Sequence, residues 1–203
     1  MAAPIRIVLK EEEEIDMKEL AVEEEVCEVL DIQQEDNGKY GNLFLVDNDA
    51  LDLEETLGHY LPELKTSAFG DATVRQVMDM TTGLNYTEIY TDPNSDAFAF
   101  VRAAGSLPRP AGYTGPTNSY DYLKTVKKAG EHGQAFGYKS VNAEVLGWLV
   151  SRVSGKPLAE VMSERFWGPM GMEHDANIQI DTNGSALAAG GLNLSLRDLA
   201  RFC

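Results

Sequence analysis

The chain of 203 residues carries 33 acidic side chains against 17 lysines and arginines, a formal net charge of −16. This charge excludes nucleic acid and an anionic membrane surface as expected partners, because both repel an acidic protein. The 43% of hydrophobic residues is typical of a globular domain with its own core. The two cysteines, Cys27 and Cys203, give no disulfide framework, and the absence of a signal segment or a long apolar run predicts a cytoplasmic protein.

Residues 1–40 are predicted to be an acidic leader, because acidic residues far outnumber lysines between Lys10 and Asp36. A thin apolar stripe with helical spacing is present at Val22, Val26, Val29 and Leu30. Two interpretations remain open: a marginal helix that serves as an interaction tail, and a solvated, poorly ordered leader. Residues 41–203 are expected to form one partial domain, truncated within its last helix at the C-terminus.

The first part of this domain contains short helices and one long connection. Leu51–Leu61 predicts an acidic helix that ends at Pro62, and Thr73-x-x-Gln76 is a capping box for the next helix. Residues 83–115, rich in Gly, Pro, Tyr, Asn and Asp, predict a connection without regular structure, which at this length is usually functional or mobile. Tyr120–Lys128 predicts a further short helix.

The clearest helix is predicted to start with Ser140 as its N-cap and to end at Gly155 as a left-handed C-cap. Its apolar stripe comprises Val141, Val145, Leu146, Leu149, Val150 and Val153. Pro157 opens a second helix, whose buried face is expected to be Leu158, Val161, Met162, Phe166 and Trp167. The remaining predicted features are strands at Ile5–Leu9 and Asn177–Asp181, a tight turn at Gly190-Gly191 and a helix capped by Ser195-x-x-Asp198.

One segment carries a family resemblance, namely Phe136-Gly-Tyr138-Lys-Ser140-Val-Asn-Ala-Glu-Val-Leu146-Gly147. It resembles the Tyr-x-Asn/Ser element of class C β-lactamases and of their esterase and amidase relatives. Further matches follow in the family's order and spacing: Val74-Arg-Gln-Val-Met-Asp-Met-Thr81-Thr-Gly83, Ser154-Gly-Lys-Pro157, Phe166-Trp-Gly-Pro169-Met-Gly-Met172, Gly190-Gly-Leu192 and Arg197-Asp-Leu-Ala-Arg-Phe202. The chain is therefore similar to the serine hydrolases of the β-lactamase and penicillin-binding-protein superfamily.

Within this superfamily the chain is most similar to the 6-aminohexanoate-dimer hydrolases. Glu88-Ile-Tyr90-Thr-Asp-Pro93, Gly115-Pro116, Glu131-His-Gly133 and Leu146-Gly-Trp148 carry this likeness. The resemblance implies an α/β (α+β) fold of the β-lactamase/transpeptidase type. We expect an incomplete version of this fold, consisting mainly of its helical part with few strands.

The resemblance also implies hydrolysis of an amide or ester bond. A serine hydroxyl needs a base to take its proton, and this superfamily supplies a lysine one helical turn later, as Ser-x-x-Lys. A tyrosine from a neighbouring element completes the proton path to the leaving group. Tyr138 matches that tyrosine as general acid/base, Ser140 supports it, and Tyr90 is the candidate lid residue over a substrate amide. The alternatives are a core tyrosine packed beside Phe136 for Tyr138 and a surface aromatic for Tyr90.

The matching nucleophile is not found. No serine of the chain is followed by a lysine three positions later. In relatives the nucleophile helix leads into a Leu-Val-Asp turn, here Leu45-Val46-Asp47, and counting back puts the nucleophile near Ile32 and the lysine near Glu35. A Lys/His-Thr-Gly strand is not found either. We therefore expect an inactive chain as it stands; the alternatives are a non-catalytic binding relative and a fragment that is unstable alone.

No cofactor is expected. His59, His132 and His174 are isolated, without the spacing of a metal site, and His132 has no partner visible in the sequence. The expected partner is a small-molecule amide or ester substrate. Neither its identity nor the oligomeric state can be read from the sequence.

Overall fold

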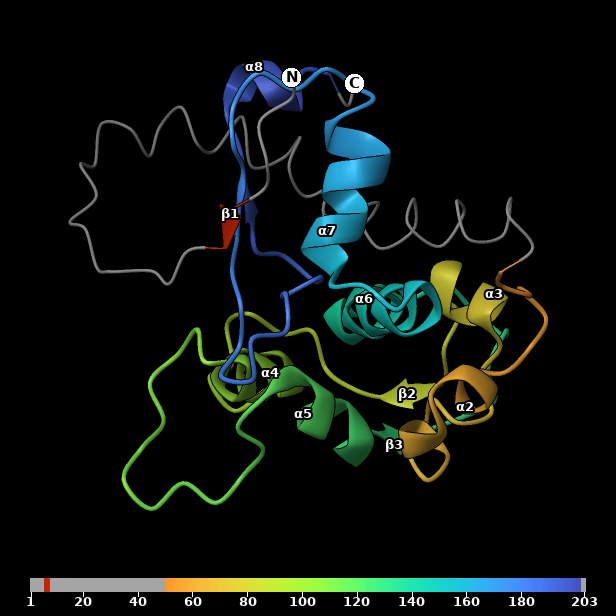
Figure 1. The fold of residues 1–203 in the computed structure, drawn as a ribbon. Helices are drawn as coiled ribbons and strands as arrows, with labels where there is room; N and C mark the ends of the chain where they lie inside the picture. Colours follow the sequence, from red (N-terminus) through yellow and green to blue (C-terminus); the bar gives the residue numbers. More distant parts are fainter. Residues whose placement is uncertain (1–5, 8–49, 202–203) are drawn as a thin grey trace.

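The structure, a computed structural model, describes residues 6–7 and 50–201. Helix α6 (Ser140–Ser154) lies at the centre of the molecule, between α7 (Leu158–Met162) on one side and α4 (Asp96–Ala104) and α5 (Ser119–Thr125) on the other (Figure 1). Helices α2 (Leu57–Tyr60) and α3 (Val74–Met78) also contact it. The 3-10 turn η1 (Pro62–Leu64) follows α2, and the π-helical turn η2 (Ser163–Trp167) continues α7.

Helix α6 is buried on all sides over residues 141–150, although the sequence predicted one apolar stripe. A helix surrounded by neighbours loses its solvated face. Most residues of this stretch are small or apolar, and the polar Asn142 and Glu144 have buried hydrogen-bond partners. The predicted left-handed C-cap is confirmed, since Gly155 has φ 69°. The predicted N-cap is wrong: Lys139 occupies that position, and Ser140 is the first helical residue.

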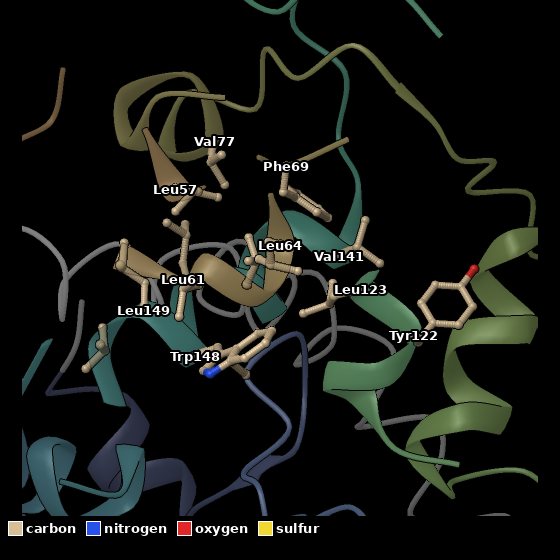
Figure 2. Packing of buried hydrophobic residues seen from close by; sticks show 14 of the residues in the cluster. Leu57, Leu61, Leu64, Phe69, Val77, Tyr122, Leu123, Val141, Trp148 and Leu149 are labelled. Atoms are coloured by element: carbon tan, nitrogen blue, oxygen red, sulfur yellow. The ribbon is translucent and has the colours of Figure 1, made fainter. Parts of the chain in front are cut away.

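The apolar faces of α2, η1, α3 and α5 meet on α6. Figure 2 shows Leu61, Leu64, Phe69 and Leu123 close to Val141 and Trp148, and all six side chains are buried. Burying one such side chain contributes about 2 kcal/mol relative to leaving it exposed. This cluster fixes the direction of α6 and therefore the position of its first residues.

The described strands are short. β4 (Asn177–Ile178) pairs in parallel with β1 (Arg6–Ile7) and antiparallel with β5 (Leu192–Asn193), which gives the order β1-β4-β5. β2 (Leu84–Asn85) and β3 (Lys127–Lys128) form a separate antiparallel pair. The helical character with few strands that the resemblance implied is confirmed.

Three predicted elements need correction. In Leu51–Leu61 only residues 57–60 are helical, because a turn and an isolated bridge from Thr56 to Thr73 precede them. The long connection at residues 83–115 contains β2 and α4, whose buried face is Ala97, Phe100, Ala103 and Ala104. The predicted helix at Tyr120–Lys128 ends at Thr125, since the two lysines of β3 pair with β2.

Several local predictions are confirmed. Thr73 and Gln76 form both hydrogen bonds of a capping box at α3. Ser195 caps α8 (Leu196–Leu199) by accepting a hydrogen bond from the Asp198 amide. The predicted buried face of α7 and η2 is buried except for Phe166, which is half-buried.

The acidic leader and the expected positions of the nucleophile and its lysine, Ile32 and Glu35, lie outside the described residues. The division at residue 40 stays a prediction. Among the residues that the structure describes, no helix is long and apolar enough to cross a membrane.

Candidate active site

Residues 136–140 lead into α6 and are held against the loop that follows α3. The Gly137 amide donates to the Met80 carbonyl at 2.9 Å, and the Lys139 ammonium contacts the Thr82 carbonyl at 3.4 Å. Met80 adopts a left-handed backbone conformation with φ 53°, uncommon for a residue other than glycine. The first bond fixes the backbone just before Tyr138, and the Lys139 side chain adds a contact just after it.

A buried amide inside α6 adds a second connection to the same loop. The Asn142 side chain accepts a hydrogen bond from the Thr82 hydroxyl at 2.9 Å and contacts the Met80 sulfur at 3.2 Å. Both Asn142 and Thr82 are buried. Because a buried polar group needs its partners, this pair makes the register between loop and helix specific.

The carboxylate of Glu88 brings two of the predicted site residues together. Its Oε1 accepts hydrogen bonds from the hydroxyls of Tyr90, at 2.5 Å, and of Ser140, while its Oε2 accepts from the Ser140 amide at 3.3 Å. Glu88 and Ser140 are half-buried, whereas 62% of Tyr90 is exposed. Glu88 was part of the resembling segment, but no pattern along the chain pointed to this role, because its partner Ser140 is 52 positions away.

Tyr138 is half-buried beside this cluster, and Phe136 is 71% exposed. Partial burial raises the pKa of Tyr90 above its ordinary value, and the hydrogen bond to Glu88 and the nearby Tyr138 phenol raise it further. The Tyr90 phenol is therefore protonated at neutral pH, and its hydroxyl donates to the Glu88 carboxylate. The structure thus gathers Tyr90, Tyr138 and Ser140 into one region.

Two of the histidines, His132 and His174, have partners from distant segments of the chain. His132 is buried, its Nδ1 accepts from the Gly83 amide at 3.0 Å, and its Nε2 lies 3.1 Å from Asp71. The expectation that His132 is isolated is therefore wrong, because its partners come from distant segments. His174 contacts Asp198 at 3.0 Å. Within residues 6–7 and 50–201, no group of three or more His, Cys, Asp or Glu residues is placed to hold a metal ion.

Two buried acids were also missed by sequence reasoning. Glu144 in α6 accepts hydrogen bonds from the amides of Ala188 and Ala189 at 2.9 and 3.1 Å, and burial raises its pKa to about 7. For Asp198 burial acts in the same direction, but hydrogen bonds outweigh it and lower the pKa to about 2. The Asp198 donors are the amides of Glu173 and His174, the Ser195 hydroxyl, the His174 ring and the Arg201 guanidinium.

Comparison with known proteins assigns the chain to a family. The family model described as Beta-lactamase matches residues 42–203, so the chain belongs to the beta-lactamase family. Among curated relatives, it is 36% identical over 157 residues to the 6-aminohexanoate-dimer hydrolase of Paenarthrobacter ureafaciens. The matched segment covers 77% of this chain and 39% of that protein. The family resemblance read from the sequence is thus confirmed.

Solved structures agree on the fold. A Bacillus anthracis protein assigned as a 6-aminohexanoate-dimer hydrolase superposes with a TM-score of 0.76 at 36% identity, covering 84% of this chain and 45% of that one. The beta-lactamase/D-alanine carboxypeptidase of Yersinia pestis has a TM-score of 0.58 at 19% identity, covering 83% and 50%, and shows the shared fold alone. The chain therefore has the predicted β-lactamase/transpeptidase-like fold and spans half or less of the length of these relatives.

Proposed function

We propose that this chain carries the acid–base part of a hydrolase for amide or ester bonds. In this proposal Tyr138 is the general acid/base, Ser140 supports it, and Tyr90 faces the substrate from the loop. One observation carries the proposal: Tyr90 and Ser140, fifty positions apart in the sequence, share the Glu88 carboxylate beside Tyr138. The identity to a 6-aminohexanoate-dimer hydrolase supports a small-molecule amide as substrate class.

The chemistry follows from what a tyrosine hydroxyl can do next to an acyl-transfer centre. Tyr138 would take the proton of an attacking serine and return it to the leaving amine or alkoxide, a role worth about 100- to 10,000-fold in rate. Ser140, two residues later, keeps its hydroxyl on Glu88 and so fixes the turn that carries Tyr138. The attacking serine and its lysine would belong near positions 32 and 35, where the chain has isoleucine and glutamate.

The proposal predicts how an activated-serine probe reacts with the chain. The natural chain should form no adduct with a fluorophosphonate, because Ile32 and Glu35 cannot act as nucleophile and base. The double variant Ile32→Ser with Glu35→Lys should form one adduct at position 32, detected by intact mass and peptide mapping. Adding Tyr138→Phe should slow this labelling by about 100-fold.

A matched control separates the hydroxyl of Tyr138 from tyrosine hydroxyls in general. Tyr113→Phe removes a hydroxyl that donates to the Pro116 carbonyl away from the cluster, and should leave the labelling rate of the double variant unchanged. Equal labelling with and without Tyr138→Phe contradicts the proposed role. A cooperative urea transition combined with no labelling of any variant favours the second function, a non-catalytic binding relative.

A further inference from the structure

Three donors from two distant segments meet on the Glu88 carboxylate. The donors are the Tyr90 hydroxyl within the loop, and the hydroxyl and amide of Ser140 at the start of α6. Hydrogen bonds to a charged acceptor are about twice as strong as those between neutral groups. Glu88 therefore ties the loop to the helix more firmly than a neutral side chain could.

The loop around Glu88 is anchored at its base. Thr87 and Asp96 bind each other through the Thr87 amide and hydroxyl, both 2.9 Å from the Asp96 carboxylate, and through the Asp96 amide at 3.0 Å. Just before this pair, Tyr86 is buried and lies edge-on to Tyr122. The base of the loop thus keeps its position whether or not the Glu88 carboxylate is hydrogen-bonded to Ser140.

The outer part of the loop has much less to hold it. Ile89 is 49% exposed, and residues 91–94 are exposed as well. The bonds within this part are local, such as the Asn94 amide to Asp92 at 2.9 Å and the Ser95 amide to the Asp92 carbonyl at 3.0 Å. Among the described residues, the hydrogen bonds to Glu88, together with the contact of the Tyr90 hydroxyl with Ser140, therefore link residues 88–94 to α6.

Charge favours the same link from the helix side. Ser140 is the first residue of a helix of 15 residues, whose N-terminal amides carry a partial positive charge. The Glu88 carboxylate faces that end, so it complements the helix and satisfies one amide that has no partner within the helix. Replacing the carboxylate with a neutral group weakens the link on both counts.

We propose that Glu88 is a positioning residue, which holds the Tyr90 loop against the start of α6 and thereby sets the geometry of Ser140 and Tyr138. Its contribution to reaction rests on the proposed function of Tyr138. The link itself does not, because it can be measured without turnover. A failure of the labelling experiment above would leave the following measurements fully interpretable.

Hydrogen exchange with mass spectrometry tests the link in the natural chain. Glu88→Ala should accelerate exchange at the amides of residues 88–94 and 140–143 by about tenfold, the effect of losing one charge-assisted hydrogen bond. Glu88→Gln keeps one acceptor oxygen and should give an intermediate rate. Asp92→Asn is the control, because it makes the same acid-to-amide change as Glu88→Gln in the same loop but at a side chain without contact to α6. It should leave the exchange rates of both segments unchanged. Rates within twofold of the natural chain for Glu88→Ala overturn the proposal.

A spectroscopic measurement separates positioning from local stiffness. In protein labelled at the tyrosine ζ-carbon, the resonance of Tyr138, assigned by its loss in Tyr138→Phe, should shift in Glu88→Gln and stay in place in Asp92→Asn. The Glu88→Gln variant also covers the case in which Glu88→Ala fails to fold. An unmoved Tyr138 resonance in Glu88→Gln, with the Tyr90 resonance displaced, would show that Glu88 orders the loop alone and would refute the link to Tyr138.

Discussion

Two glutamates act on the same helix in opposite surroundings. Glu88 approaches the exposed start of α6 and accepts three hydrogen bonds, two of them from hydroxyls. Glu144 lies inside α6, fully enclosed, and accepts two backbone amides from residues 188 and 189. Both link α6 to a segment more than forty positions away, but only Glu88 keeps access to solvent.

The two glutamates differ in how completely hydrogen-bond donors satisfy the oxygen atoms of each carboxylate. Among the described residues, Oε1 of Glu144 and the buried hydroxyl of Ser119 have no well-aligned hydrogen bond, although the two groups lie close enough to interact. Burial raises the pKa of Glu144 to about 7, although Ser119, Ala189 and Ala188 act against this shift. The buried glutamate therefore fixes one arrangement at an energetic cost, whereas the half-exposed one joins two segments and can separate from them at lower cost.

The largest effect is expected from Glu144→Gln, compared with the natural chain at pH 5 and pH 8. The pKa of Glu144 is raised from 4.5 to about 7 in the folded state, so the folded state binds its proton more tightly than the unfolded state. Stability is therefore full below pH 4.5 and is lost as the pH rises through 7. At pH 8 the lost contribution of Glu144 to the unfolding free energy is about 3 kcal/mol.

The glutamine variant should avoid this loss, because it is neutral, still accepts the two amides and can donate to Ser119. Urea unfolding should show the variant more stable than the natural chain at pH 8 and nearly equal at pH 5. Glu131→Gln, at a side chain that is 83% exposed, is the control and should show no such difference. A pH-independent gap between Glu144→Gln and the natural chain would mean that Glu144 is compensated as well as Glu88.

The second prediction tests the contact that Glu144 maintains. A β-carbon on Gly147 would collide with the Ala188 side chain, one of the two residues whose amides bind Glu144. Gly147→Ala should therefore lower the unfolding free energy by about 1–3 kcal/mol, the usual cost of overpacking. Ala188→Gly in the same chain should restore much of the loss, since it removes the colliding atom. No rescue by Ala188→Gly would mean that the segment is not held against α6 at this point.

Sequence reasoning succeeded where the cause is local. The capping box of Thr73 and Gln76, the left-handed Gly155 and the cap of Ser195 on Asp198 each depend on residues within four positions. Such motifs are readable because their partners follow at fixed spacing. Family likeness supplied the fold and the candidate residues Tyr90, Tyr138 and Ser140, but their roles stay predictions.

The rest depended on contacts that spacing does not encode. His132 meets Asp71 across 61 positions, and Glu144 meets Ala188 across 44, so neither partner is visible along the chain. Helix α4 was hidden by the glycines and prolines on both sides, yet Ala97, Phe100 and Ala104 repeat with helical spacing and could have revealed it. The full burial of α6 could not be read either, because it reflects how many neighbours surround the helix.

The smallest effect is expected at the exposed end of α6. Ser140→Ala removes the hydroxyl that binds Glu88 but keeps the backbone amide that binds the same carboxylate. Because both groups are half-buried and solvent can replace the lost partner, the unfolding free energy should fall by no more than about 1 kcal/mol. Ser151→Ala, near the other end of the same helix, is the matched control in urea unfolding at pH 7. A loss for Ser140→Ala larger than that for Gly147→Ala would mean that the exposed link is as rigid as the buried one, and the contrast between the two glutamates would not hold.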